Sequence, residues 1–289
     1  MTSTFLIISS IFDKLLYHIS VRLRLGRNFF YSIMVGDAKY LHIIYSNKVK
    51  RVVMMGWFGG SSKEYDFEMF SVSHFVIIAI LFLVSAAIFI NRHKLKQAIR
   101  RKTEVGIAIS LIVIETCYHI WMYVNDMWDT SHAIPLELCS ISLVLSVILL
   151  LTRKIIIYEI LLFTALLGAT QAIFTPLLKF EFPHFRFFHF FYTHLMEIWV
   201  VFYFTWVKGY RPTIWSVVKL FIFLNVLMPI IMLINKAVDG NYLFLSHKPS
   251  GASLLDLLGP YPWYILSMEF LLITLSLIVW LIFRKKRVQ

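Results

Sequence analysis

The sequence predicts an all-α membrane protein: a bundle of seven transmembrane helices with the N-terminus outside and the C-terminus in the cytoplasm. The first observation is composition, because 59% of the 289 residues are hydrophobic and only 15% are charged. A soluble domain needs about 25% charged residues. The other two observations are a series of long apolar runs and the alternation of basic and nearly uncharged loops between them.

The apolar runs all follow residue 70. Each is close to the roughly 20 residues that a helix needs to cross about 30 Å of hydrocarbon. The seven predicted spans are Ser71–Ile90, Val105–Val124, Leu136–Leu151, Ile155–Phe174, Phe188–Val207, Ile214–Ile234 and Trp263–Phe283. The last outer loop, Asn235–Pro262, contains three Gly and three Pro and is expected to fold over the outer mouth of the bundle.

The loops predict the orientation, since Lys and Arg collect on the cytoplasmic side of short loops. Basic residues follow the first, third, fifth and seventh spans, in the segments Arg92–Lys102, Arg153–Lys154, Lys208–Arg211 and Arg284–Arg287. The loop Asn125–Pro135, on the other side, has two Asp and no Lys or Arg. This pattern places the N-terminus outside and the C-terminus in the cytoplasm.

The formal net charge of +12 does not indicate a nucleic-acid partner. The basic residues lie between apolar runs, whereas a nucleic-acid-binding protein groups them on one folded face. The two cysteines, Cys117 and Cys139, fall inside apolar runs and do not support a structural disulfide or a zinc site. No metal or cofactor is predicted.

Residues 1–53 form a basic leader that does not fit the orientation. The segment contains eight Lys or Arg and only two Asp, and it would have to be translocated across the membrane. Its apolar stretches are too short to span, and no signal-peptide cleavage site follows them. We expect that translation begins at Met54 or Met55 and that residues 54–289 form the transmembrane domain. The alternative is an amphipathic helix on the cytoplasmic surface, which requires an extra crossing or the opposite topology.

Ionisable side chains inside spans are costly, by roughly 2.5–3.5 kcal/mol at a helix centre, so each needs a reason. Depth counted from the outer surface places most of them within about two or three turns of it. The candidate site residues are Cys139, His194, Glu137, His119, Glu115, Gln171, Glu197 and Glu269. The alternative for any one of them is a hydrogen bond to a neighbouring helix that holds the bundle together.

Cys139 is the candidate nucleophile and His194 the candidate base. A cysteine needs a partner that takes its proton or stabilises its thiolate, and the N-terminal dipole of a helix that begins near Leu136 would add to that stabilisation. The alternative for Cys139 is a small buried apolar residue. His189 and His194 are five residues apart, which is not the spacing of a helical metal pair.

Several stretches carry a resemblance to a known group. They are Phe70, Ser71, Ser73 and His74, then Trp121–Tyr123, Ile134–Ser142 and Phe185–His194. From about Phe70 to the C-terminus the chain resembles the YwaF-like bacterial integral membrane proteins, and residues 1–53 lie outside the similarity. The resemblance implies a multi-pass protein of the bacterial plasma membrane.

That bacterial family is similar to a eukaryotic family of cysteine-dependent transmembrane acyltransferases that remodel ether phospholipids. The resemblance implies a lipid acyltransferase or acyl hydrolase whose partners are membrane lipids. In the family's Pro-Leu-x-Leu-Cys motif the nucleophile corresponds to Cys139 and the base, on a later span, to His194. The motif commonly has His where this chain has Glu137.

Two other functions stay open from the residues themselves. The first is a transporter or channel-like protein that binds an ion, a proton or a small solute in the intramembrane polar cluster, because Glu and His also serve in proton relays. No internal repeat and no pair of broken helices supports it. The second is a seven-span binding or sensor protein.

Overall fold

The computed structural model describes residues 56–63, 65–249 and 254–285. Within these ranges the regular secondary structure is helical, apart from one isolated antiparallel bridge between Asp66 and Phe180. The predicted all-α class is therefore confirmed for the described residues. The basic leader and the expected start at Met54 or Met55 lie outside them.

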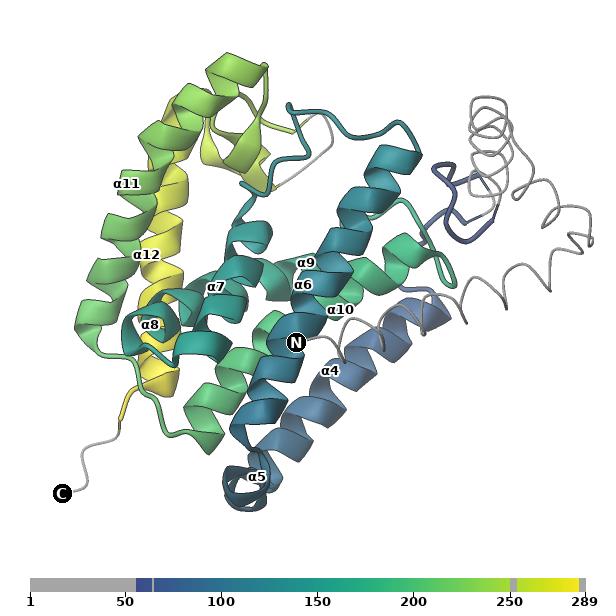
Figure 1. Cartoon of the computed structure of the whole chain (residues 1–289). Helices are drawn as coiled ribbons and strands as arrows, with labels where there is room; N and C mark the ends of the chain where they lie inside the picture. Colours follow the sequence, from purple (N-terminus) through teal and green to yellow (C-terminus); the bar gives the residue numbers. More distant parts are fainter. Residues whose placement is uncertain (1–55, 64, 250–253, 286–289) are drawn as a thin grey trace, which may run out of the picture. The chain divides into compact units, whose positions relative to one another are not determined.

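A helix occupies each predicted apolar run (Figure 1). The α-helices are α4 (Val72–Ile90), α5 (Arg92–Ala98), α6 (Arg101–Val124), α7 (Leu138–Thr152), α8 (Ile155–Thr164), α9 (Thr170–Phe174), α10 (Phe185–Phe202), α11 (Ile214–Val238) and α12 (Trp263–Phe283). Two π-helices, η1 (Ala165–Ala169) and η2 (Tyr203–Val207), continue α8 and α10, and two short 3₁₀-helices, η3 (Tyr242–Phe244) and η4 (Leu254–Leu258), lie in the loop before α12.

Five helical segments are long and apolar enough to cross a membrane: α4, α6, the continuous run Ile155–Phe174, α11 and α12. The chain is thus a multi-pass membrane protein by the length and composition of its helices. Helix α7 is apolar but has only 15 residues. Helix α10 is not among the five, because Arg, His and Glu side chains lower its mean hydropathy.

The centre of the bundle is formed by α8 with η1 and by α10 with η2. Several of their large side chains are fully buried, among them Tyr158, Phe163 and Phe204. Helices α4, α11 and α12 instead expose apolar side chains along most of their length, which is the pattern of helices that face lipid. Helices α11 and α12 lie side by side (Figure 1), and α7 packs against α6, α8 and α10.

The start of α4 is fastened to the loop before α10. Ser71 caps α4 and donates to Glu181 Oε2 at 3.0 Å, and Ser73 donates to the other carboxylate oxygen. Partial burial opposes ionisation of Glu181, but the hydrogen bonds donated to it keep the pKa of its carboxyl below the ordinary value. His74 is fully buried and donates from Nε2 to the Ile173 carbonyl at 2.8 Å. This histidine is therefore a structural one.

The first part of the loop after α11 packs over the segment that leads into α7. The Tyr242 hydroxyl donates to the Thr130 carbonyl at 2.7 Å and accepts from the Ile134 N–H at 2.9 Å. The Leu243 N–H donates to Glu137 Oε2 at 3.3 Å. These bonds fix the loop against the N-terminal end of α7, where Cys139 lies.

Candidate functional site

Glu115 on α6 is the centre of a polar cluster between α6 and α10. Its Oε2 accepts from His189 Nε2 at 2.9 Å, and its Oε1 lies 3.6 Å from His119 Nε2, one turn further along α6. The indole of Trp128 donates to His119 Nδ1 at 3.3 Å. One carboxylate thus stands between two imidazoles, with its side chain only 19% exposed.

Arg186 extends the cluster on the α10 side. Its Nη1 donates to His189 Nδ1 at 2.8 Å, so that His189 accepts from the guanidinium on one side and donates to Glu115 on the other. The guanidinium lies 4.4 Å above the Tyr118 ring, which stacks on His189 at 4.2 Å. We call Glu115, His119, His189 and Arg186 the Glu115 cluster.

His194 lies deeper on α10 and is buried. Its Nδ1 donates to the Phe190 carbonyl at 2.6 Å, because a carbonyl oxygen can only accept. In the neutral ring this leaves Nε2 unprotonated, with a lone pair available for a proton. His194 is within electrostatic range of Glu115, His189 and Arg186. The backbone bond thus fixes the orientation of the imidazole ring.

Glu197, one turn beyond His194, is almost fully buried. Its Oε2 has no hydrogen-bond partner among the residues that the structure describes. A buried polar atom without a partner costs about 1–3 kcal/mol, so such positions are uncommon and call for a functional explanation. Glu197 is within electrostatic range of both Glu115 and Cys139.

Cys139 lies in the first turn of α7, opposite the π-helix η1. A Cβ at Gly168, the last residue but one of η1, would lie 3.8 Å from Cys139 Sγ and 3.4 Å from the Leu138 side chain. The backbone of η1 thus passes close to the thiol, at a distance that leaves ordinary contact room for one added methyl group, and π-helical turns are frequent at functional sites. Cys139 and His194 make no hydrogen bond to each other in the described part of the chain, although the helices that carry them, α7 and α10, pack against each other.

A groove of about 320 Å³ runs between α6 and α7, beside the polar cluster. Glu115 and His119 line it from α6, and Leu143 and Val147 line it from α7. Leu143 is four residues after Cys139 and thus on the same face of α7. The groove is otherwise lined mainly by aliphatic side chains, which suit an acyl chain.

The remaining candidate residues lie elsewhere. Glu137 precedes α7 and accepts from the Leu243 N–H, so its carboxylate is engaged by the loop after α11. Gln171 on α9 is exposed, and Glu269 on α12 is half-buried. Neither of these two side chains makes a hydrogen bond within the described ranges, and the structure shows no polar contact that links them to the Glu115 cluster.

His189 and Arg186 are members of the cluster that sequence reasoning missed. Their spacing of three residues on one helix was a usable signal, because it places both side chains on one face of α10. The contact with Glu115 was not accessible from spacing, since 74 residues separate Glu115 from His189.

Comparison with known proteins gives one family. The model of the TMEM164 family matches residues 69–280. No curated protein and no solved structure matches the chain significantly.

Proposed function

The chain belongs to the TMEM164 family, and from that premise we propose that it is a membrane-embedded lipid acyltransferase or acyl hydrolase. Cys139 is the nucleophile, His194 is the general base, and the substrates are acyl esters of membrane lipids. The observation that carries this proposal is the hydrogen bond between His194 Nδ1 and the Phe190 carbonyl, because it leaves Nε2 as a proton acceptor on the helix against which α7 packs.

The proposed reaction has two halves. His194 Nε2 takes the thiol proton, and the Cys139 thiolate attacks the ester carbonyl of a phospholipid. A carbon–sulfur bond forms, the ester carbon–oxygen bond breaks, and the departing alkoxide takes the proton from His194 to leave a lysophospholipid and a thioester. In the second half His194 removes a proton from an acceptor hydroxyl or from water, the oxygen attacks the thioester, and the thiolate regains the proton.

The groove between α6 and α7 supports the choice of substrate. Its aliphatic walls continue the face of α7 that carries Cys139, so an acyl chain in the groove would present its ester near the thiol. Glu115 and His119, at the groove wall, are placed to bind polar groups of the lipid or to orient the reacting base. Glu197, Gln171, Glu137 and Glu269 remain proposed supporting residues.

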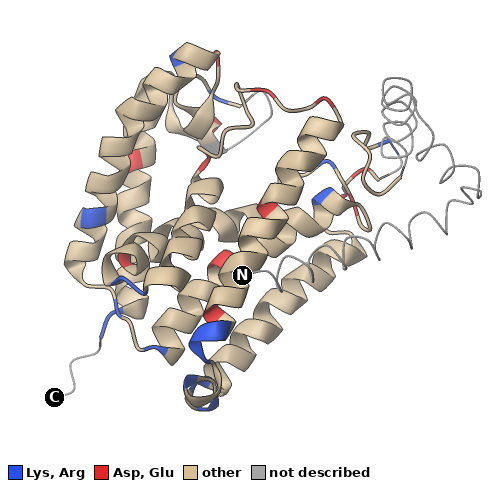
Figure 2. Cartoon of the chain, in the orientation of Figure 1, with Lys and Arg blue, Asp and Glu red and all other residues tan. Residues whose placement is uncertain are grey.

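The proposed topology has seven spans, with α7 and the continuous helix α10–η2 crossing as well as the five long segments. Lys and Arg cluster around α5 and the start of α6 (Figure 2), and Arg153 and Lys208 follow α7 and η2. This distribution supports a cytoplasmic position for these ends, an outer N-terminus and a cytoplasmic C-terminus. The proposed location is the plasma membrane of a bacterium.

Substitution of the two cysteines tests the reaction with a matched control. Cys139→Ala is expected to abolish protein-dependent changes in the acyl-chain composition of phospholipids, measured by mass spectrometry of lipid extracts. Cys117→Ala, which removes the other half-buried thiol, is expected to leave these changes intact. A Cys139→Ala lipid profile equal to that of the wild type, at matched protein levels, would count decisively against the enzyme.

Glu197 favours a second candidate function, a transporter or channel-like protein that moves protons or another small ion. A buried carboxyl without a hydrogen-bond partner among the described residues, near the Glu115 cluster, is a plausible proton-binding position. In proteoliposomes, Glu197→Gln would then abolish a proton or ion flux that Cys139→Ala leaves unchanged. The enzyme proposal instead expects that Cys139→Ala abolishes the protein-dependent change in phospholipid composition.

A further inference from the structure

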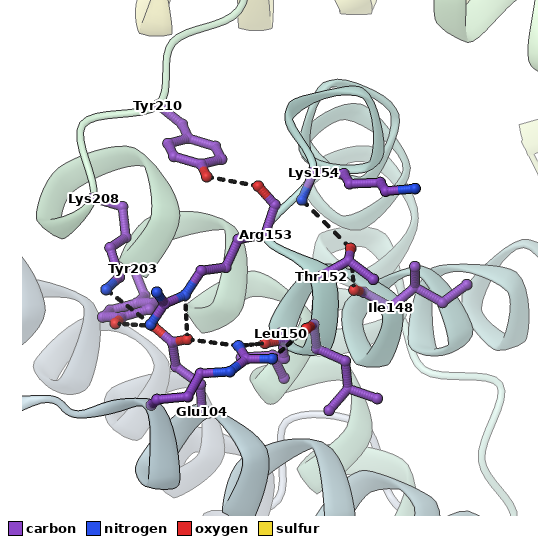
Figure 3. A network of polar contacts seen from close by, with 11 residues as sticks. Glu104, Ile148, Leu150, Thr152, Arg153, Lys154, Tyr203, Lys208 and Tyr210 are labelled. Carbon is purple, nitrogen blue, oxygen red and sulfur yellow. Dashed lines mark hydrogen bonds and ion pairs between the residues drawn. The ribbon is translucent and has the colours of Figure 1, made fainter.

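A buried carboxylate near the start of α6 binds three cations (Figure 3). Glu104 is fully buried, and its Oε2 accepts from Arg153 Nε at 2.7 Å and from Arg101 Nη1 at 3.0 Å. Its Oε1 pairs with Lys208 Nζ at 3.0 Å and accepts from the Tyr203 hydroxyl at 2.7 Å. Each carboxylate oxygen therefore has two partners, and the carboxylate has no capacity for a further cation.

The charges of this group do not balance. Three cations surround one carboxylate, which leaves a charge of +2. Glu159, the first acidic residue after Arg153 in the sequence, is occupied by Lys219 Nζ at 2.6 Å and by the Ser216 hydroxyl at 2.7 Å. A single cation would have been enough to neutralise Glu104, so the other two leave an excess of positive charge beside it.

Arg153 is the cation whose donors are not all used. Its Nε binds Glu104, but its two terminal nitrogens make no hydrogen bond to the residues that the structure describes, and its side chain is 40% exposed. Its backbone is held in the left-handed region, at φ 55°, by its N–H bond to the Leu149 carbonyl and by the Tyr210 hydroxyl, which donates to its own carbonyl at 2.7 Å. Arg153 thus presents a fixed, partly exposed pair of N–H₂ groups.

Arg101 is committed to the protein instead. Besides Glu104, its terminal nitrogens donate to the Leu150 and Leu151 carbonyls at the C-terminal end of α7. This capping uses the donors that an external ligand would need. Lys208 is 21% exposed and lies beside Arg153, because both side chains bind the carboxylate of Glu104. The open side of the group is therefore formed by Arg153, with Lys208 as its neighbour.

We propose that Arg153 and Lys208 form a binding site for the phosphate of an anionic phospholipid. The group lies where α6 begins and α7 ends, and in the proposed topology these helix ends lie at the depth of the lipid headgroups of the cytoplasmic leaflet. A lipid phosphate would accept charge-assisted bonds from the free fork of Arg153 and offset the excess charge without displacing Glu104. This site does not depend on the acyl-transfer reaction.

The test measures lipid-dependent stability of the full chain in nanodiscs. Nanodiscs of phosphatidylcholine alone are compared with nanodiscs that also contain phosphatidylglycerol, and the thermal unfolding midpoint is recorded. Wild type is expected to unfold at a higher temperature with phosphatidylglycerol, because a ligand of the folded state stabilises it. Arg153→Gln is expected to lose at least half of this rise.

Lys154→Gln is the matched control, since it removes the same charge from the next residue, whose side chain points away from Glu104 (Figure 3); it is expected to keep the full rise. Inorganic phosphate added to phosphatidylcholine nanodiscs is expected to give none. The proposal is overturned by the absence of a rise in wild type, by a full rise in Arg153→Gln, by an equal loss in Lys154→Gln, or by a rise with phosphate alone. If Arg153→Gln does not fold, Lys208→Gln takes its place under the same criterion.

Discussion

Replacing Glu104 with Gln is expected to lower the free energy of unfolding by about 3 kcal/mol. The substitution keeps the size of the side chain but leaves Arg101, Arg153 and Lys208 without their shared carboxylate. Removal of one partner from a buried ion pair costs about 3–5 kcal/mol. The lower end applies here, because water screens the two arginines, which are 43% and 40% exposed.

For a chain of this size, about 3 kcal/mol corresponds to a fall of about 6–12 °C in the unfolding midpoint, at ~2–4 °C per kcal/mol. The assay is thermal unfolding of the purified protein in one detergent. Glu269→Gln is the control, since this half-buried carboxyl has no hydrogen-bond partner within the described ranges, and it is expected to shift the midpoint by only about 1–2 °C.

A double variant tests the coupling between Glu104 and Arg153. Adding Arg153→Gln to Glu104→Gln removes one of the cations left unpaired, so the double variant is expected to be more stable than the sum of the two single effects allows. The account of this group would be refuted by a Glu104→Gln midpoint equal to that of Glu269→Gln. Strict additivity in the double variant would refute it as well.

Three other predictions concern stability and access. Because the pKa of Glu181 is lowered in the folded protein, its ionised form contributes its full stabilisation at pH values above the ordinary pKa of 4.5. This contribution is lost as the pH falls through the lower pKa of the folded state. Glu181→Gln should remove this part of the acid dependence of unfolding. Gly240→Ala should lower the free energy of unfolding by about 1–3 kcal/mol, because the new Cβ would lie 2.9 Å from the Ser131 carbonyl oxygen, which is backbone and cannot rotate away. Gly168→Leu should slow alkylation of Cys139 by a membrane-permeant maleimide, because the larger side chain fills the space beside the thiol.

Each of these three predictions has its own control variant. Glu68→Gln removes a neighbouring acidic side chain that does not accept the Ser73 bond, and it should leave the acid dependence unchanged. Gly106→Ala, where a Cβ meets no atom within 4 Å, should be tolerated. Gly168→Ala, with ordinary contact distances, should keep the wild-type alkylation rate. Equal behaviour of test and control variants in any pair would contradict the corresponding contact.

The positions of the helices could be predicted because each apolar run is bounded by polar residues. The observed ends differ from the predicted ones where polar groups at the end of a helix bind one another. Helix α6 begins at Arg101 rather than Val105, since the ion pair between Arg101 and Glu104 stabilises an additional polar turn. Helix α10 begins at Phe185 rather than Phe188, because His184 accepts from the Arg186 N–H and caps it. Hydropathy carries neither kind of information.

The candidate site was predictable only in its local parts. The pairing of Glu115 with His119 follows from a spacing of four residues on one helix. The contact of Glu115 with His189 depends on how α6 and α10 pack. The approach of Gly168 to Cys139 depends on the π-helix η1, which the apolar periodicity of the sequence does not predict. Glu104 was overlooked for a related reason: it precedes the predicted span, and two of its three cations come from the distant ends of α7 and η2.

The central proposal is a thioester on Cys139, and detection of that intermediate tests it most directly. Purified protein is incubated with a phospholipid that carries an isotopically labelled acyl chain, quenched and digested, and the cysteine peptides are analysed by mass spectrometry. The Cys139 peptide is predicted to gain the labelled acyl mass, to lose it on treatment with hydroxylamine, and to stay unlabelled in His194→Ala, while the Cys117 peptide stays unlabelled throughout. Absence of label on Cys139 in the wild type, or equal label on both cysteines, would contradict the proposal.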